Sequence, residues 1–268
     1  MNDNILEVKN LTRKFGDFTA VNSISFSIQK GEVFGIVGPN GAGKTTTIKI
    51  LTTLLPPTSG QAFTGGYNVV TQPSKVRRII GYVPQLLSAD GSLTGYENLL
   101  MFAKLYDIPR KEREKRIKDS IHFMGLDESA DKLVKGYSGG MIRRLEIAQS
   151  VLHRPKILFL DEPTIGLDPV ARETVWDYVS AISEQGTTVL MTTHYLEEAD
   201  AMCSRIAIMI RGSIAAIDTP ENLKLSVGDK NTSLNKVFEA YIGKSIDSEE
   251  GGNYKDVSRT RRTARRLG

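Results

Sequence analysis

The chain has 268 residues, of which 40% are hydrophobic and 25% are charged, so it holds enough apolar material for the core of one large domain. Its apolar runs, such as Lys156–Leu160 and Ile206–Ile210, are too short to span a bilayer, and its single cysteine excludes an internal disulfide. The opening residues lack the basic and apolar regions of a signal peptide, which predicts a cytoplasmic protein that does not itself cross a membrane.

The formal charge of +4 is located in the C-terminal tail. The last twelve residues contain five arginines and no acidic residue; removing those five from the 35 basic residues leaves 30 against 31 acidic residues. The rest of the chain therefore has no excess of basic residues, and we predict no nucleic-acid partner. The tail is typical of a solvated, disordered terminus, and contact with anionic lipid is the alternative interpretation.

Along the chain, strand and helix patterns alternate. The first thirty residues alternate apolar and polar positions, which predicts an antiparallel sheet with one exposed face. A short apolar run at Gly31–Gly38 is followed by glycines and by a helical pattern that stops at Pro56. Residues 91–152 carry helical patterns without strand runs and indicate a helical insert. Later apolar runs predict an α/β sheet with parallel strands at its centre, namely RIIGYV, KILFL, TTVLMTT and RIAIMI.

The segment Gly38–Thr46, GPNGAGKTT, satisfies the P-loop pattern. Its glycines let successive backbone N–H groups point at phosphate oxygens, and the following helix presents its positive dipole end to the same anion. Lys44 would reach the β- and γ-phosphates, and the Thr45 hydroxyl would hold Mg²⁺. A flexible turn that matches by chance is the alternative, but the flanking strand and helix favour nucleotide binding. The predicted nucleotide-binding residues of this loop are Gly38, Pro39, Asn40, Gly41, Ala42, Gly43, Lys44, Thr45 and Thr46.

Two acidic residues, Asp161 and Glu162, follow the apolar run KILFL. Because parallel strands end at the ligand-bearing edge of a sheet, both carboxylates would lie near the P-loop. Asp161 can order the magnesium shell, while Glu162 can polarise the attacking water. A simple turn before Pro163 is the alternative, and the P-loop upstream favours the catalytic interpretation.

These motifs and four others resemble the ATP-binding cassette (ABC) ATPases over about Leu6–Leu225. The others, in chain order, are YVPQ with Gln85, YSGGM at Tyr137–Met141, GLDP with Asp168, and TTH with His194. The resemblance implies an α/β P-loop NTPase core with a parallel central sheet, an N-terminal antiparallel β subdomain and an inserted helical subdomain. We predict a nucleotide-binding domain at residues 1–224, with the helical subdomain at about 88–152, and a C-terminal extension at 225–268.

The YSGGM segment is similar to the family's signature motif. Two cassettes of this family pair head to tail, so the resemblance implies that Ser138, Gly139 and Gly140 contact the γ-phosphate held by a partner's P-loop. Tyr137 and Met141 depart from the commonest form, and Met141 cannot make the hydrogen bonds of the usual glutamine. Read without the family, Ser-Gly-Gly is a linker before a helix.

The resemblance also implies roles for four single residues. Gln85 would contact Mg²⁺ and the attacking water, and the alternative is a polar strand cap. His194 would contact the γ-phosphate, and the alternative is a structural histidine. Asp168 would contact the other cassette of the dimer, or serve only as a turn residue, and Phe15 would contact the adenine ring, or be a core aromatic residue. The predicted catalytic set is thus Glu162, His194 and Gln85, the metal set is Thr45, Gln85 and Asp161, and the cofactors are ATP and Mg²⁺.

Three longer stretches look like the daunorubicin-resistance type of ABC exporter ATPase: the segment from YSGGM to GLDP, MTTHYLEEAD and RGSIAAIDTPENLK. LNKVFEAYIG resembles the terminal helix common in that group. This implies an ATPase that exports drugs, lipids or polysaccharides through a separate transmembrane permease at the cytoplasmic face of the cell membrane. A homodimer is sufficient, and a heterodimer remains open. A soluble assembly ATPase, for instance in iron-sulfur cluster building, is the alternative. A translation or DNA-repair ATPase fits less well, because the chain has one cassette and no long heptad run.

Overall fold

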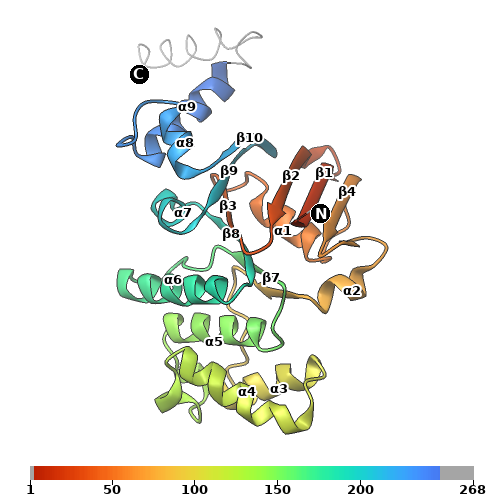
Figure 1. Cartoon of the computed structure of the whole chain (residues 1–268), viewed down its shortest axis with the longest axis vertical. Coiled ribbons are helices and arrows are strands. Elements are labelled where there is room, and N and C mark those ends of the chain that lie inside the picture. The colour runs from red at the N-terminus through yellow and green to blue at the C-terminus, as the bar shows by residue number, and fades with distance from the viewer. Residues whose placement is uncertain (1–2, 248–268) are drawn as a thin grey trace, which may run out of the picture. The chain divides into compact units, whose positions relative to one another are not determined.

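The structure, a computed structural model, describes residues 3–247 (Figure 1). These residues fall into two units divided after Pro220. The first unit holds both sheets and helices α1 to α7. The second unit begins at Glu221 and holds most of α8 (Pro220–Leu225) together with α9 (Leu234–Asp247). The boundary expected after residue 224 therefore falls inside α8, and the arginine-rich tail lies outside the described residues.

The central sheet has six strands in the order β10-β9-β3-β8-β7-β6. Neighbouring strands are parallel except β10, which runs antiparallel to β9. Residues of β7 and β8 are buried throughout, as is typical of parallel strands that are covered on both faces. The predicted α/β class with parallel strands at its centre is confirmed. The strands are β3 (Val33–Val37), β6 (Ile80–Val83), β7 (Ile157–Asp161), β8 (Thr188–Thr193), β9 (Arg205–Ile210) and β10 (Ser213–Asp218).

A second, four-stranded antiparallel sheet has the order β2-β1-β4-β5. The long strands β1 (Asn4–Phe15) and β2 (Phe18–Gln29) confirm the antiparallel sheet predicted for the opening residues, and β4 (Ser59–Thr64) and β5 (Tyr67–Asn68) complete it. Its apolar face shares one core with α1 (Lys44–Leu51) and the central sheet, and the Phe26 ring stacks on Phe34 of β3 at 5.4 Å.

Helices α3 (Gly95–Leu105), α4 (Arg110–Phe123) and α5 (Gly139–Val151) form the predicted helical insert and group together in Figure 1. Thr94 starts α3 with a capping box, in which its hydroxyl accepts from Glu97 N and the Glu97 carboxylate accepts from Thr94 N. Three further helices of the first unit are α2 (Pro73–Arg77), α6 (Pro169–Glu184) and α7 (Leu196–Met202). Over residues 3–247, no helix combines the length and hydrophobicity needed to cross a bilayer.

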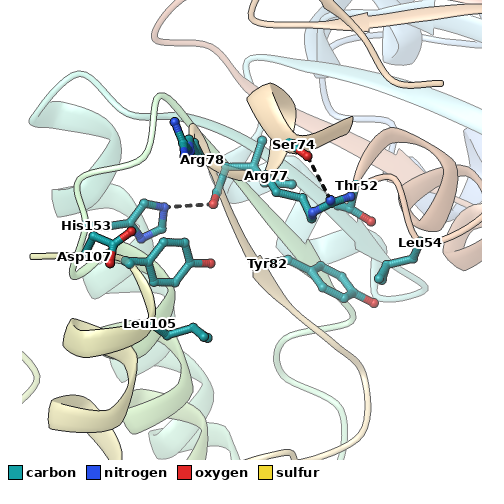
Figure 2. A pocket seen from close by; sticks show the side chains of 11 residues that line it. Thr52, Leu54, Ser74, Arg77, Arg78, Tyr82, Leu105, Asp107 and His153 are labelled. Atoms are coloured by element: carbon teal, nitrogen blue, oxygen red, sulfur yellow. Dashed lines mark hydrogen bonds between the residues drawn. The ribbon is translucent and has the colours of Figure 1, made fainter. Parts of the chain in front are cut away.

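His153, just after α5, joins the helical insert to β6. Its ring stacks on Tyr106 at 3.8 Å between centroids, and its Nε2 donates to the Ile80 carbonyl oxygen at 2.9 Å. These residues line a cavity of about 830 Å³ between the insert and the central sheet (Figure 2). Burial lowers the pKa of His153 from 6.5 to about 4, so the histidine is neutral near pH 7.

His153 makes this contact sensitive to acid. The unfolded chain binds a proton at its ordinary pKa of 6.5, whereas the folded chain resists protonation down to about pH 4. The stability that His153 contributes is therefore complete above pH 6.5 and is lost as the pH falls, by about 3 kcal/mol over this window. In denaturant titrations at pH 7, 5.5 and 4.5, His153→Gln should show a shallower loss of unfolding free energy than the wild type. Equal slopes for His153→Gln and the wild type would contradict the prediction.

Candidate nucleotide-binding site

The P-loop connects β3 to α1, as the pattern predicts. Gly38 passes so close to β9 that an added Cβ would lie 2.2 Å from the Met209 carbonyl oxygen. Gly43, the residue before α1, has a φ of +103°, a conformation that side chains rarely adopt. These two positions explain why the loop requires glycine, and their packing fixes the cradle at the start of α1.

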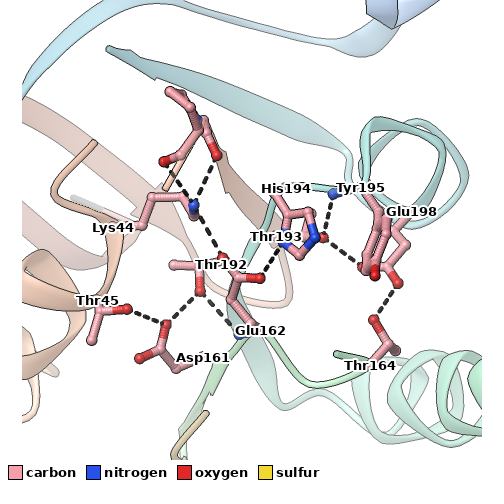
Figure 3. A network of polar contacts seen from close by, with 12 residues as sticks. Lys44, Thr45, Asp161, Glu162, Thr164, Thr192, Thr193, His194, Tyr195 and Glu198 are labelled. Atoms are coloured by element: carbon pink, nitrogen blue, oxygen red, sulfur yellow. Dashed lines mark hydrogen bonds and ion pairs between the residues drawn. The ribbon is translucent and has the colours of Figure 1, made fainter. Parts of the chain in front are cut away.

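Lys44 is 5% exposed and lies inside this cradle (Figure 3). Its ammonium donates to the Gly38 and Pro39 carbonyl oxygens at 2.7 and 3.2 Å, and it forms an ion pair with Glu162 Oε1 at 3.1 Å. The loop and Glu162 therefore hold the ammonium within the cradle at the start of α1.

Asp161, at the end of β7, has the features of a residue that holds a metal ion. Its Oδ1 accepts from the Thr45 hydroxyl at 3.0 Å and from the Thr192 hydroxyl at 2.7 Å. Its Oδ2 is buried and has no hydrogen-bond partner, and burial raises the pKa of the carboxyl group. Buried polar atoms are normally satisfied, so an orphaned carboxylate oxygen beside a hydroxyl is the donor set that fits a hard cation such as Mg²⁺.

Glu162 lies between two cationic or ionisable partners. It is 5% exposed, and its carboxylate contacts Lys44 on one side and His194 Nδ1, directly after β8, on the other. Its φ of +51° is unusual for a residue with a side chain, and its N–H donates to the carbonyl oxygen and hydroxyl of Thr192. Backbone strain of this kind concentrates at functional sites, where it aims a side chain.

A pocket of about 400 Å³ brings predicted residues from distant segments together. Its lining includes the P-loop, Gln85, Glu162 and two aromatic residues, Phe15 and Phe18. Phe15 is 45% exposed, so it is not the core aromatic of the alternative interpretation, and the Arg13 guanidinium lies 4.5 Å from its ring centroid. Phe18, 63% exposed, was missed by the sequence analysis; the FGDF spacing around the hairpin is the signal that could have indicated it.

The signature residues and Asp168 lie outside this pocket. Ser138 and Gly139 are exposed, and the Ser138 hydroxyl caps α5 by accepting from Met141 N at 3.3 Å. Asp168 caps α6 in the same way, accepting from Ala171 N at 2.9 Å. Within one chain, these side chains act as helix caps.

A further polar network, also missed from sequence, joins the segments that follow β7 and β8 (Figure 3). Glu198 of α7 is fully buried and accepts from the hydroxyls of Thr164 and Thr193. Arg172 of α6 approaches the same carboxylate at 3.7 Å. Glu198 thus fixes the segments after Glu162 and before His194 relative to each other. Sequence offers two adjacent glutamates at this point, and only the packing of α7 selects the buried one.

A strand, P-loop and helix, with an acidic pair at the end of β7, a parallel strand separated from β3 by β8 alone, define the class of P-loop nucleoside triphosphatases. The sequence profile of the ABC transporter family matches residues 21–165, more than half of the chain. The chain belongs to the ABC transporter family.

Relatives and solved structures agree with this assignment. The linearmycin resistance ATP-binding protein LnrL of Bacillus subtilis is 40% identical over 224 residues, which are 84% of this chain and 72% of that protein. The daunorubicin/doxorubicin resistance ATP-binding protein DrrA of Streptomyces peucetius is 45% identical over 223 residues, 83% of this chain and 68% of that protein. A solved ATP-binding subunit of an ABC transporter superposes with a TM-score of 0.81 at 28% identity, covering 89% of this chain and 99% of its own.

These comparisons confirm the predicted ABC ATP-binding subunit of the daunorubicin-resistance type. They do not favour the iron-sulfur assembly alternative.

Proposed function

We propose that this chain hydrolyses Mg-ATP at two sites shared by a pair of cassettes, and that the resulting opening and closing drives a separate transmembrane subunit. The pair is a homodimer in this proposal. The observation that carries it is the convergence of Lys44, Asp161, Glu162 and His194 at the edge of the central sheet, with Gln85 lining the same pocket. Resistance proteins among the relatives favour export, and drugs, lipids or polysaccharides remain the proposed cargo classes.

ATP binding would change the partners of Lys44 first. Phosphate oxygens are charged acceptors and form stronger hydrogen bonds than the Gly38 and Pro39 carbonyls. The ammonium would therefore move toward the phosphates and away from Glu162, to which it is now paired at 3.1 Å. Loss of this pairing leaves Glu162 Oε1 free to take a proton from the attacking water.

Three residues would hold Mg²⁺: Thr45 by its hydroxyl, Asp161 by its unpartnered Oδ2, and Gln85 by its side-chain amide oxygen. The bound ion would supply charge neutralisation at the β- and γ-phosphate oxygens. His194 would hold the γ-phosphate, Phe15 would stack on adenine, and Ser138, Gly139, Gly140 and Met141 would act on the ATP of the other cassette. Asp168 would lie at the contact between the two cassettes.

The transmembrane subunit would dock over the cavity in Figure 2, at the cytoplasmic face of the membrane. Leu54 and Leu105 line this cavity and are 56% and 72% exposed, which is unusual for large apolar side chains. Tyr82 of β6 also lines it, and three residues later the chain reaches Gln85 at the ATP pocket. A partner seated there could therefore shift Gln85 directly.

Co-purification from native membranes tests the proposal. The tagged chain, solubilised in mild detergent with ATP, should recover a multi-spanning membrane protein that mass spectrometry identifies. Leu105→Glu should reduce that recovery at least about fivefold, because a charge would be buried at an apolar contact. Leu133→Glu, an exposed leucine that does not line the cavity, should leave it unchanged. Recovery of only soluble partners would contradict the transport role.

A further inference from the structure

A buried arginine and a buried glutamate of α5 hold the loop that carries Gln85. Arg143 is 1% exposed, and its guanidinium donates to the Pro84 and Gln85 carbonyl oxygens at 2.7 and 2.9 Å. Glu146 is 3% exposed, accepts from Arg143 at 3.0 Å, and also accepts from the backbone N–H and hydroxyl of Ser88. Together these two side chains bind the loop at both ends of the segment 84–88.

The hydrogen bonds that Arg143 and Glu146 make outside their own ion pair indicate that this pair holds the loop in place. A buried ion pair overcomes its desolvation only with good geometry and additional hydrogen bonds, and an apolar pair often packs a helix equally well. Here the additional bonds go to residues 84–88, which form neither helix nor strand. Leu86 and Leu87, between the two attachment points, are 81% and 50% exposed, so burial of their side chains does not hold the loop. Arg143 and Glu146 supply the attachment instead.

The same side of α5 supports the next part of the loop. Gln149 Nε2 donates to Asn98 Oδ1 at 3.2 Å. Asn98 in turn accepts from Asp90 N at 3.0 Å and donates to the Asp90 carbonyl oxygen at 2.9 Å. Arg143, Glu146 and Gln149 are spaced three residues apart and therefore lie on neighbouring turns of one helix side. α5 thus holds the loop from residue 84 to residue 90, directly at residues 84–88 and through Asn98 at Asp90.

We propose that Arg143 and Glu146 are positioning residues for ATP hydrolysis, which hold Gln85 at the ATP pocket and make its loop move together with α5. This inference rests on the ATPase function proposed above. Because α5 begins next to Ser138, a displacement of the loop would be carried to the segment that serves the ATP of the other cassette. The buried pair therefore links the Gln85 site of one cassette to the signature segment acting on the second.

The first test removes both charges at once, so that neither is left buried and unpaired. In Arg143→Met/Glu146→Leu, kcat should fall about tenfold while KM for ATP stays within about twofold of the wild type, since Gln85 acts on the reacting groups and the P-loop binds the nucleotide. Amide hydrogen exchange should rise in peptides that cover residues 84–90.

Arg144→Met is the matched control. Arg144, the next residue of the same helix, donates to the Met124 and Gly125 carbonyl oxygens at 2.9 and 3.2 Å and makes no bond to the Gln85 loop. This variant should keep the wild-type kcat and the wild-type exchange at residues 84–90. A second variant, Arg143→Lys, keeps a charge beside Glu146 but lacks the planar fork that reaches two carbonyls, so it should fold and lose about threefold in kcat.

A mutant cycle separates positioning from general stability. If Arg143 and Glu146 act through Gln85, adding Gln85→Ala to the double variant should lower kcat no further than Gln85→Ala alone. The inference would be overturned if the kcat losses of Gln85→Ala and of the double variant multiplied in the triple variant. Unchanged amide hydrogen exchange at residues 84–90 in the double variant would also overturn it. A wild-type chain that hydrolyses no ATP would instead refute the proposed function, and the exchange measurement would still decide whether the pair holds the loop.

Discussion

Glu162→Gln is expected to lower the rate of ATP hydrolysis by about 10³-fold without weakening ATP binding. Glutamine has the same size and tolerates the φ of +51° no worse than glutamate does, so the fold should be retained. It cannot accept a proton from the attacking water, and its amide cannot neutralise Lys44. ATP should consequently remain bound, and an ATP-loaded dimer should accumulate.

Size-exclusion chromatography with and without Mg-ATP, alongside a phosphate-release assay, measures both effects. Glu173→Gln is the control. Glu173 is exposed on α6, so this substitution removes one negative charge away from the site. It should hydrolyse ATP normally and show no trapped dimer. Normal turnover by Glu162→Gln would remove Glu162 from the role of general base.

Lys44→Ala and Ser138→Arg should each abolish activity and should complement each other when mixed. Lys44→Ala removes a charge-assisted phosphate contact, which should weaken ATP binding by about 10- to 100-fold. Ser138→Arg places a long side chain at an exposed position where the phosphates of the second cassette would approach. In a mixed dimer, both defects fall in one site and the other site is intact. An equal mixture should therefore recover about a quarter of the wild-type activity.

Two additional measurements make this complementation decisive. Differently tagged copies, co-purified from the mixture, establish that mixed dimers have formed. Ser138→Ala measures the effect of the lost helix cap by itself, which should reduce stability by about 1 kcal/mol, and this smaller change should lower activity less than Ser138→Arg does. Mixed dimers without recovered activity would contradict the head-to-tail arrangement.

Local patterns in the sequence determined the parts of the site that depend on short segments. The strand, glycine loop and helix around Gly38–Thr46 follow from one motif, because tight turns and helix starts are fixed by residues a few positions apart. The same holds for the acidic pair that ends β7 and for the three helices of the insert. Each of these elements has its determinants within its own length.

The sequence patterns could not predict which distant segments pair with each other. β1 pairs with β4, about fifty residues later, and Phe18 joins Phe15 at the pocket only because the β1–β2 hairpin folds over the P-loop segment. Glu198 could not be distinguished from Glu197 by pattern, since the choice depends on which side of α7 faces Thr164 and Thr193. Long-range packing decides such contacts.

The sequence by itself determined the family motifs, the α/β class, and the P-loop and acidic pair of the candidate site, because backbone conformation and charge at these positions are set locally. Only the tertiary structure decided how those residues are held. Burial left Asp161 Oδ2 without a partner, placed Glu162 between Lys44 and His194, and turned Arg143 and Glu146 of α5 toward the Gln85 loop. The physical reason is that a buried charge has lost its hydration, so its stability depends on the positions of its hydrogen-bond and ion-pair partners. Those positions exist only once distant strands and helices have packed together.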